Sequence, residues 1–235
     1  LPQLSYPVNE AFNTLSTNVS FLGRNIKKIM LTSSHASEGK SFTSITLCRK
    51  LAERGKRVVL VDTDLRRSMI TTVYGVQFAP GSKKQGLSHY LAGIAEKEEV
   101  LFHTNVPGMD FIPMGHELLN PIPLLSSERF QNLLDGLAEQ YDYVIVDAAP
   151  VGVVIDAAEI AKVCDGILLV VSYNQVHRQE LIDAKNQLEQ TGCPILGTIL
   201  NQVDYEGFAN KKYYYKSHYS SYYKAYEKEA EEKKS

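Results

Sequence analysis

Hydrophobic and polar positions divide the chain into two kinds of segment. Short apolar runs rich in β-branched residues are separated by stretches in which apolar residues recur at helical spacing. We predict strands at six such runs, which are KKIMLTSS (27–34), RVVLVDTD (57–64), MDFIP (109–113), DYVIVDAAP (142–150), GILLVVSY (166–173) and PILGTILNQV (194–203). Strands that alternate with helices predict an α/β fold whose mostly parallel sheet is covered by helices on both faces.

The stretches with helical spacing predict five helices. They cover residues 7–22, 41–54, 126–140, 155–164 and 177–190. Gly55 and Gly192 follow two of these stretches, as expected where a helix ends. Residues 74–85 contain Gly, Pro, Ser and Lys with little periodicity, so we predict a surface loop there.

The pattern stops after Val203, where Lys, Tyr, Glu and Ser replace the aliphatic residues. We therefore predict a folded domain over residues 1–203, with an N-terminal helix within residues 1–25, and a flexible tail over residues 204–235. Seven of the fourteen tyrosines of the chain lie close together in this tail, at Tyr213, Tyr214, Tyr215, Tyr219, Tyr222, Tyr223 and Tyr226. No core could bury them there, so we expect them to serve a purpose other than packing.

Composition narrows the function only in part. A formal net charge of −2 and a pI near 6.3 argue against a general nucleic-acid binder, and the tail glutamates dilute the attraction of its lysines, so we expect no nucleic-acid partner. Cys48, Cys164 and Cys193 are odd in number and widely spaced, which favours reduced, buried thiols. The longest apolar runs are shorter than the roughly 18 residues of a membrane span.

A phosphate-binding motif follows the first predicted strand. The residues TSSHASEGKSFTS lead from that strand into a helix, where backbone N–H groups can bind phosphate. Lys40 could reach the terminal phosphates and the Ser41 hydroxyl could bind Mg²⁺. The pattern G-x-x-x-x-G-K-[ST] is broken, because Ser34 stands where the first glycine belongs. Taken alone, GKS fits a helix N-cap followed by an exposed lysine better than a phosphate site.

Two further strands end in acids. RVVLVDTDLRR brings Asp62 and Asp64 to the carboxyl end of a strand, where open α/β sheets bind ligands and paired carboxylates suit metal binding or proton abstraction. The alternative is a charged turn with solvated side chains. YDYVIVDAAP ends in Asp147, which could hold Mg²⁺ beside the phosphate loop as a Walker B aspartate does. One lysine and three acids at three strand ends predict a nucleotide site.

Together these motifs resemble the bacterial tyrosine kinases that regulate capsular and exopolysaccharide synthesis, and the resemblance covers nearly the whole chain. EGKS resembles the end of that family's Walker A motif, VVLVDTDLRRS its Walker A′ motif, VIVDAAPVGVVIDA its Walker B region, and the tyrosine cluster its autophosphorylation tail. The resemblance implies a P-loop fold and an enzyme that uses ATP and Mg²⁺ to phosphorylate protein tyrosines.

The resemblance also implies roles for single residues. The catalytic residues would be Lys40, Asp62 and Asp64, and of the two aspartates we favour Asp62 as the base. Ser41, Asp62 and Asp147 would hold the metal. The nucleotide would contact Ser37, Glu38, Gly39, Lys40, Ser41 and Phe42, together with Asn201, which matches a position where related P-loop ATPases commonly contact adenine. The seven tail tyrosines would be the phosphorylation sites.

The chain departs from the family pattern in three places, one of which is Ala149 before a single Pro150 where the Walker B region usually continues with two prolines. Ala36 and Ser37 stand where the family usually has Gly or Pro-Gly, so we expect a phosphate loop with less backbone freedom. The segment EAFNTLSTNVSF resembles the helix through which family members form rings. Asn13 and Ser16 replace its two arginines and should leave Glu10 without its usual partners, and the segment fits a helix docked on the core equally well.

The resemblance implies several partners. They are ATP, the tyrosine tail of a second copy in a homo-oligomer, a transmembrane polysaccharide co-polymerase or adaptor that activates the kinase, and a cognate tyrosine phosphatase. Such a chain would be cytoplasmic and recruited to the inner face of the cell membrane by its adaptor. A tail of about 15 residues spans roughly 20 Å, which favours phosphorylation in trans.

Two other functions stay open. A partitioning or carrier ATPase of the P-loop superfamily would use the same site to control dimerisation. Those relatives usually have a second lysine where this chain has His35, and no paired cysteines suggest a metal cluster. A pseudokinase without tyrosine transfer would account for the altered loop.

Overall fold

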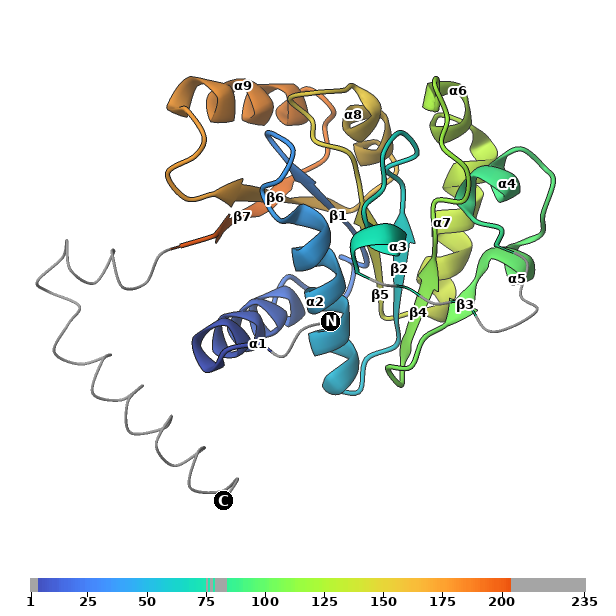
Figure 1. Cartoon of the computed structure of the whole chain (residues 1–235), viewed down its shortest axis with the longest axis horizontal. Coiled ribbons are helices and arrows are strands. Elements are labelled where there is room, and N and C mark those ends of the chain that lie inside the picture. Colours follow the sequence, from blue (N-terminus) through green and yellow to red (C-terminus); the bar gives the residue numbers. More distant parts are fainter. Residues whose placement is uncertain (1–3, 75, 77, 79–83, 204–235) are drawn as a thin grey trace, which may run out of the picture.

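The computed structural model describes residues 4–74, 76, 78 and 84–203, which form one sheet with helices on both faces (Figure 1). In these residues seven strands are hydrogen-bonded in the order β3-β4-β2-β5-β1-β6-β7. Their bounds are Lys28–Ser33 (β1), Val58–Asp62 (β2), Phe102–His103 (β3), Met109–Ile112 (β4), Tyr143–Asp147 (β5), Gly166–Ser172 (β6) and Ile195–Asn201 (β7). All neighbouring strands are parallel apart from β3 and β4. The predicted fold is therefore confirmed.

The six predicted strands all form, and among the described residues β3 is the one strand that the pattern missed. This strand pairs antiparallel with β4 at the edge of the sheet, with Phe102 opposite Phe111. Two residues are too few to show an alternation of apolar and polar positions, so β3 depends on its partner strand rather than on its own sequence.

The five predicted helices also form, with shifted ends. They are Tyr6–Ser20 (α1), Lys40–Glu53 (α2), Glu128–Gln140 (α7), Asp156–Ala161 (α8) and Arg178–Glu189 (α9). The third begins two residues later than predicted because Ser127 is its N-cap and accepts a hydrogen bond from the Phe130 N–H. Four short helices were not predicted, and they are Ile70–Val73 (α3), Leu87–Leu91 (α4), Lys97–Val100 (α5) and Ile122–Leu125 (α6).

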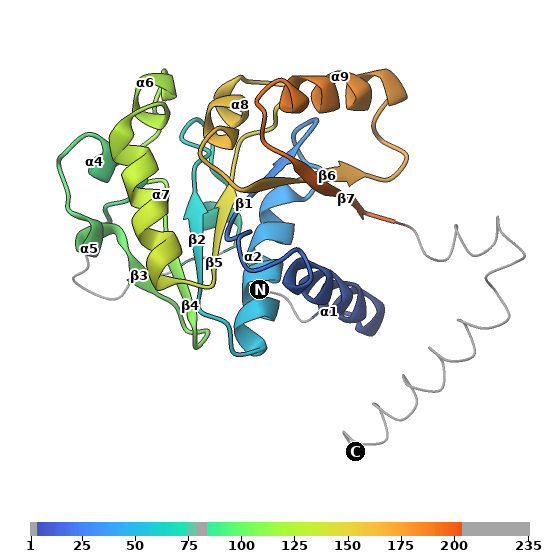
Figure 2. The same ribbon diagram turned by 180° about the vertical axis from the view of Figure 1, so that it is seen from behind.

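Alternate residues of each central strand point into two different cores. In β1, Ile29 and Leu31 pack with residues of α2, whereas Met30 belongs to a cluster with α7, α8 and α9. Helices α1 and α2 lie on one face of the sheet and α7, α8 and α9 on the other, as Figures 1 and 2 show from the two sides. Because both faces are covered, the polar groups at the ends of the strands collect at the rims of the sheet.

Helix α1 is docked on α2. The Phe12 ring meets the Phe42 ring edge-on at 5.8 Å, and the Arg54 guanidinium donates to the buried Ser16 hydroxyl at 3.3 Å. Glu10 lacks the two arginines, as expected, but it has another partner, because Asn13 Nδ2 donates to Glu10 Oε1 at 2.9 Å within the same helix. The residues that replace the two arginines are thus engaged inside the protomer.

The cysteines are free thiols, with Cys48 and Cys193 buried and Cys164 half-buried, which agrees with the predicted reduced state. No helix of the described ranges has the length and apolar character that crossing a membrane requires. The predicted surface loop 74–85 lies largely outside the described residues, and the tyrosine tail lies outside them altogether.

Candidate nucleotide site

A pocket of about 760 Å³ opens at the carboxyl end of the parallel strands. Its walls come from the loops that follow β1, β2, β5 and β7. Carboxyl ends of parallel strands meet at one rim of the sheet, so residues far apart in the chain become neighbours there. In particular, Asp62 and Asp147 are register partners at the ends of β2 and β5.

Lys40, Ser41 and Asp147 form the centre of this site. The Lys40 ammonium lies 2.8 Å from Asp147 Oδ2, and the Ser41 hydroxyl donates to the same oxygen at 2.8 Å. Ser44, one turn further along α2, donates to Asp147 Oδ1 at 2.7 Å. Lys40 is 7% exposed, so the exposed lysine of the alternative interpretation is wrong. In this structure these side chains bond one another. Phosphate oxygens and a metal ion could replace these bonds when a nucleotide is present.

Asp62 lies beside this centre and is fully buried. Its Oδ2 accepts a hydrogen bond from Ser68, whereas its buried Oδ1 has no hydrogen-bond partner among the described residues. Burial and the charge of Asp147 raise the pKa of Asp62 to about 8, although the Ser68 hydrogen bond and the charge of Lys40 act in the opposite direction. The alternative of a solvated turn therefore fails for this residue.

The phosphate loop is shaped by a buried carboxylate, Glu38, although its first glycine is missing. Glu38 Oε2 accepts from the Ser34 hydroxyl at 2.8 Å and from the His35 N–H at 2.7 Å. Glu38 Oε1 accepts from the Ser172 N–H of β6 at 2.9 Å. Ser34, in the place of the missing glycine, is thus a hydrogen-bond donor that helps to close the loop.

Two side chains at the end of β7 fasten the same loop, and we call them the β7 latch. Asn201 Nδ2 donates to the Glu38 carbonyl and Gln202 Nε2 to the Ser37 carbonyl, both at 2.9 Å. Ser37 has a φ of +68° and Gly39 a φ of +81°, both in the left-handed region. A Cβ on Gly39 would come within 2.1 Å of Asn201, so this position requires glycine. The loop therefore closes despite Ser37, because the latch holds its carbonyl.

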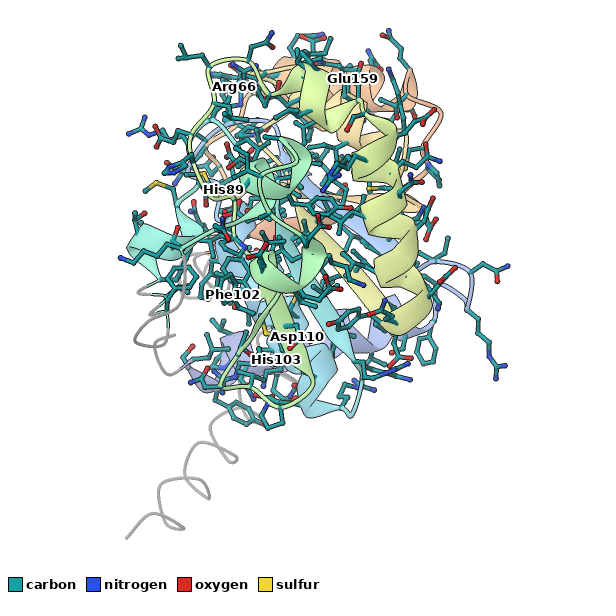
Figure 3. The ribbon with its side chains drawn as sticks, turned by 90° about the vertical axis from the view of Figure 1, so that its right-hand side faces the viewer. Arg66, His89, Phe102, His103, Asp110 and Glu159 are labelled. Atoms are coloured by element: carbon teal, nitrogen blue, oxygen red, sulfur yellow. The ribbon has the colours of Figure 1, made fainter. Side chains whose placement is uncertain are left out.

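The two arginines after Asp64 differ in their partners. Arg66 makes a bidentate pair with buried Asp156, at 2.6 and 2.9 Å, and donates to the Leu119 carbonyl at 2.9 Å. Figure 3 shows Arg66 at the same end of the molecule as Glu159. Arg67 is exposed, and its backbone N–H donates to Asp64 Oδ1 at 3.1 Å. Asp64 and both arginines line the pocket.

The predicted site residues fall into three groups. Lys40, Ser41, Asp62 and Asp147 come together at the centre, and a wider set lines the pocket, namely Ser37, Glu38, Gly39, Lys40, Ser41, Phe42, Asp64 and Asn201. The seven tail tyrosines, Tyr213 to Tyr226, lie outside the described residues, so their use stays a prediction.

Sequence reasoning missed several residues that complete the site. Ser44 follows Ser41 by three residues and could have been recognised from its helical spacing. Gln202 and Ser172 carry no such signal, because each bonds a partner that only the folded sheet brings near. Ser68 bonds Asp62 within the loop after β2, where no regular spacing marks it.

The oxygen donors of the site fit a magnesium ion. Within the described residues no group of three or more His, Cys, Asp or Glu side chains could hold a metal by itself. Mg²⁺ in nucleotide sites usually takes one or two carboxylates together with waters and phosphate oxygens. Ser41, Asp147 and the unpartnered oxygen of Asp62 supply such an incomplete set. The site therefore suits a metal that arrives with a nucleotide.

Comparisons with known proteins identify relatives of the chain in sequence and in fold. A family model described as AAA domain matches residues 26–191. Tyrosine-protein kinase CpsD of Streptococcus agalactiae serotype III (strain NEM316) is 39% identical, with 83% of this chain and 82% of that protein covered. CpsD of Streptococcus pneumoniae is 37% identical, with 83% and 84% covered. The kinase domain of the Escherichia coli tyrosine kinase ETK superposes with a TM-score of 0.76 at 34% identity, covering 83% of this chain and 75% of that one.

Proposed function

We propose that this chain, which belongs to the bacterial tyrosine-protein kinases, transfers the γ-phosphoryl group of ATP to the tyrosines of its own C-terminal cluster. Membership makes the chain a protein-tyrosine kinase, and the proposal adds the nucleotide, the acceptor and the residues. The observation that carries it is the buried Lys40–Asp147 pair with Ser41, whose lysine and serine line the pocket and which unites the positive charge, hydroxyl and carboxylate that phosphoryl transfer requires.

Each residue of the centre has a separate task in this proposal. Lys40 neutralises charge on the transferring phosphoryl group, and Ser41 and Asp147 hold Mg²⁺, which supplies further charge neutralisation when bound. The tyrosine oxygen forms the new bond to phosphorus as the bond to ADP breaks, and the phenolic proton passes to a carboxylate. We assign that proton to Asp62, which is buried beside the centre and is the register partner of Asp147 at the end of the neighbouring strand.

The nucleotide base belongs at the β7 side of the pocket. Asn201 and Gln202 line that side and already bond the backbone of the phosphate loop. A base placed there would leave the phosphates above Lys40 and the N-terminus of α2, where backbone N–H groups favour anions.

The proposal is tested by incubation with Mg-ATP, alone and with the cytoplasmic segment of a candidate membrane adaptor. Phosphotyrosine is mapped by mass spectrometry beside a Lys40→Met control. We expect phosphate on the tail cluster that is absent in the control. An unmodified tail in a protein that still binds ATP would contradict the proposal and favour a nucleotide-gated switch.

We propose further that the tail is phosphorylated in trans within a homo-oligomer, and that this controls capsular or extracellular polysaccharide synthesis together with a membrane adaptor and a tyrosine phosphatase. Each phosphate adds about −1.5 to −2 charges, so several on one tail would repel neighbouring tails and favour disassembly. A full-length Lys40→Met chain mixed with an active chain whose cluster tyrosines are all Phe separates the two routes. Label on the Lys40→Met tail is expected, and its absence would exclude transfer in trans.

A further inference from the structure

The strand order divides the pocket into two sides. The loops at its rim follow the order β2, β5, β1, β6 and β7, so the phosphate loop after β1 lies between the β2 and β7 sides. The β7 side carries the polar latch. The β2 side is lined by apolar residues from α3 and from the loop after β5, among them Met69, Val73, Val153 and Val154.

These apolar residues are more exposed than their character suggests. Met69 is 45% exposed, Val73 57% and Val153 61%. Exposed apolar side chains gathered around one hollow mark a binding surface more often than scattered ones do. Tyr74 adds an aromatic wall, since it also lines the pocket and its ring centroid lies 6.5 Å from that of Phe42.

The β2 side also lies close to the reacting groups. Burial raises the pKa of Tyr74, the charge of Asp147 raises it further, and Lys40 lowers it. Tyr74 also lines the same pocket as Lys40 and Ser41, and its ring lies near Phe42, which directly follows these two residues. A second aromatic ring on this surface would hold its own hydroxyl near the same centre.

Arg66 and Arg67 differ in whether an acidic side chain of this chain already pairs with them. Asp156 already takes the charge of Arg66 in a bidentate pair. Arg67 is exposed, lines the pocket and forms no ion pair with the rest of the described residues. A guanidinium in this state can attract a carboxylate on an incoming peptide.

We propose that the β2 side of the pocket is the acceptor subsite of the kinase. It takes the ring of a substrate tyrosine on Met69, Val73 and Tyr74, and Arg67 favours a carboxylate beside that tyrosine. The inference rests on the proposed function and names its preferred acceptor. Of the seven cluster tyrosines, Tyr226 alone has an acidic neighbour, Glu227, with Glu229, Glu231 and Glu232 beyond it. Tyr226 on a second copy of the chain is therefore the acceptor this subsite prefers.

The test uses two peptides with one tyrosine each. The first is KAYEKEAEE, residues 224–232, and the second carries Glu227→Lys and Glu229→Lys in the same peptide. The full-length enzyme is given Mg-ATP, and kcat/KM is measured for each peptide at low ionic strength. Peptide products are separated from the phosphorylated chain by mass.

The wild-type enzyme should favour the acidic peptide by about two- to fivefold, the range of an exposed ion pair. The preference should shrink with salt, disappear in Arg67→Ala and reverse in Arg67→Glu. Arg178→Ala is the matched control, since Arg178 is exposed on α9 outside the pocket, and it should keep the preference.

The apolar residues of the subsite are tested by a separate measurement, the KM for the peptides. Val73→Asp should raise KM for both peptides while KM for ATP stays unchanged, because the ring loses its surface and the nucleotide does not. Equal use of the two peptides by wild type and Arg67→Glu, or normal peptide KM in Val73→Asp, would overturn the acceptor subsite alone. A wild-type enzyme that labels no tyrosine anywhere would overturn the proposed function itself.

Discussion

Carboxylates stand in polar clusters at both ends of the sheet, and the two clusters differ in how completely their oxygens are used. At the amino end, Asp110 Oδ1 lies 2.7 Å from His103 Nδ1, and Asp110 Oδ2 accepts from the Tyr141 hydroxyl at 2.5 Å. Figure 3 shows His103 and Asp110 at the end of the molecule opposite Arg66. At the carboxyl end, one oxygen of Asp62 has no partner in the described part of the chain.

This difference separates a structural acid from a reactive one. Asp110 satisfies both oxygens with its own neighbours and leaves nothing for a ligand to bind. Asp147 also uses both oxygens, but two of its donors, Lys40 and Ser41, are groups that bind phosphate and metal in P-loop proteins. A carboxylate marks a functional site when its hydrogen bonding is incomplete or exchangeable, and burial alone does not mark it.

The largest expected effect comes from Lys40→Met. Phosphotyrosine formation should fall roughly 1000-fold, because a charge aimed at the transition state is lost from a largely buried site. Radiolabel transfer from ATP measures this directly. Lys185→Met, on an exposed part of α9, should retain full activity, and a Lys40→Met enzyme within tenfold of wild type would remove the carboxyl-end cluster from catalysis.

Asp62→Asn should lower transfer roughly 100-fold and stabilise the nucleotide-free protein. The pKa of Asp62 is about 8 in the folded protein and about 3.9 in an unfolded chain, so the folded state retains a proton that the unfolded state releases. The contribution of Asp62 to stability therefore falls as pH rises from about 4 to about 8. Urea unfolding across this range should show that slope in wild type and lose it in Asp62→Asn, which should be more stable by about 1 to 4 kcal/mol at pH 8.

Tyr141→Phe addresses the amino-end cluster. Without the Tyr141 hydroxyl, Asp110 Oδ2 has no phenol donor, which should lower the free energy of unfolding by about 1 to 3 kcal/mol. Kinase activity should stay within twofold of wild type, because the cluster lies at the opposite rim. Chemical denaturation and the transfer assay on one preparation give both numbers, and a matched fall in activity would erase the contrast between the two ends.

His103→Ala should have the smallest effect. The His103 side chain is 88% exposed, so its pair with Asp110 should contribute less than about 1 kcal/mol. Thermal unfolding at pH 5.5 and at pH 8 measures the difference in stability between His103→Ala and wild type. Kinase activity of the variant should equal that of wild type at both pH values.

The central part of the site was predictable because it depends on strand ends. Apolar runs that stop at Asp62 and Asp147 place these acids at one rim of a parallel sheet, and Lys40 opens the helix that follows a third strand. The bonds that refine the site were not predictable. Glu38 reaches Ser172 across 134 residues, and no local pattern of residue types specifies such a partner.

The N-terminal segment shows the same limit at short range. Its helix was predicted from spacing, but the bond between Asn13 and Glu10 depends on side-chain length and rotamer, which hydrophobic periodicity does not report. Two-residue β3 likewise forms only because β4 offers a partner.

The residues of the β7 latch are synthesised long after the phosphate loop that they hold. Asn201 and Gln202 bond the phosphate loop across sequence separations of 163 and 165 residues. Contacts of such long range form slowly because a long loop must close first, and the ribosome releases the N-terminal parts of a chain first. The phosphate loop therefore exists on the nascent chain well before the residues that fasten it. The conformation of the phosphate loop that Asn201 and Gln202 hold can therefore form only once β7 has joined the sheet.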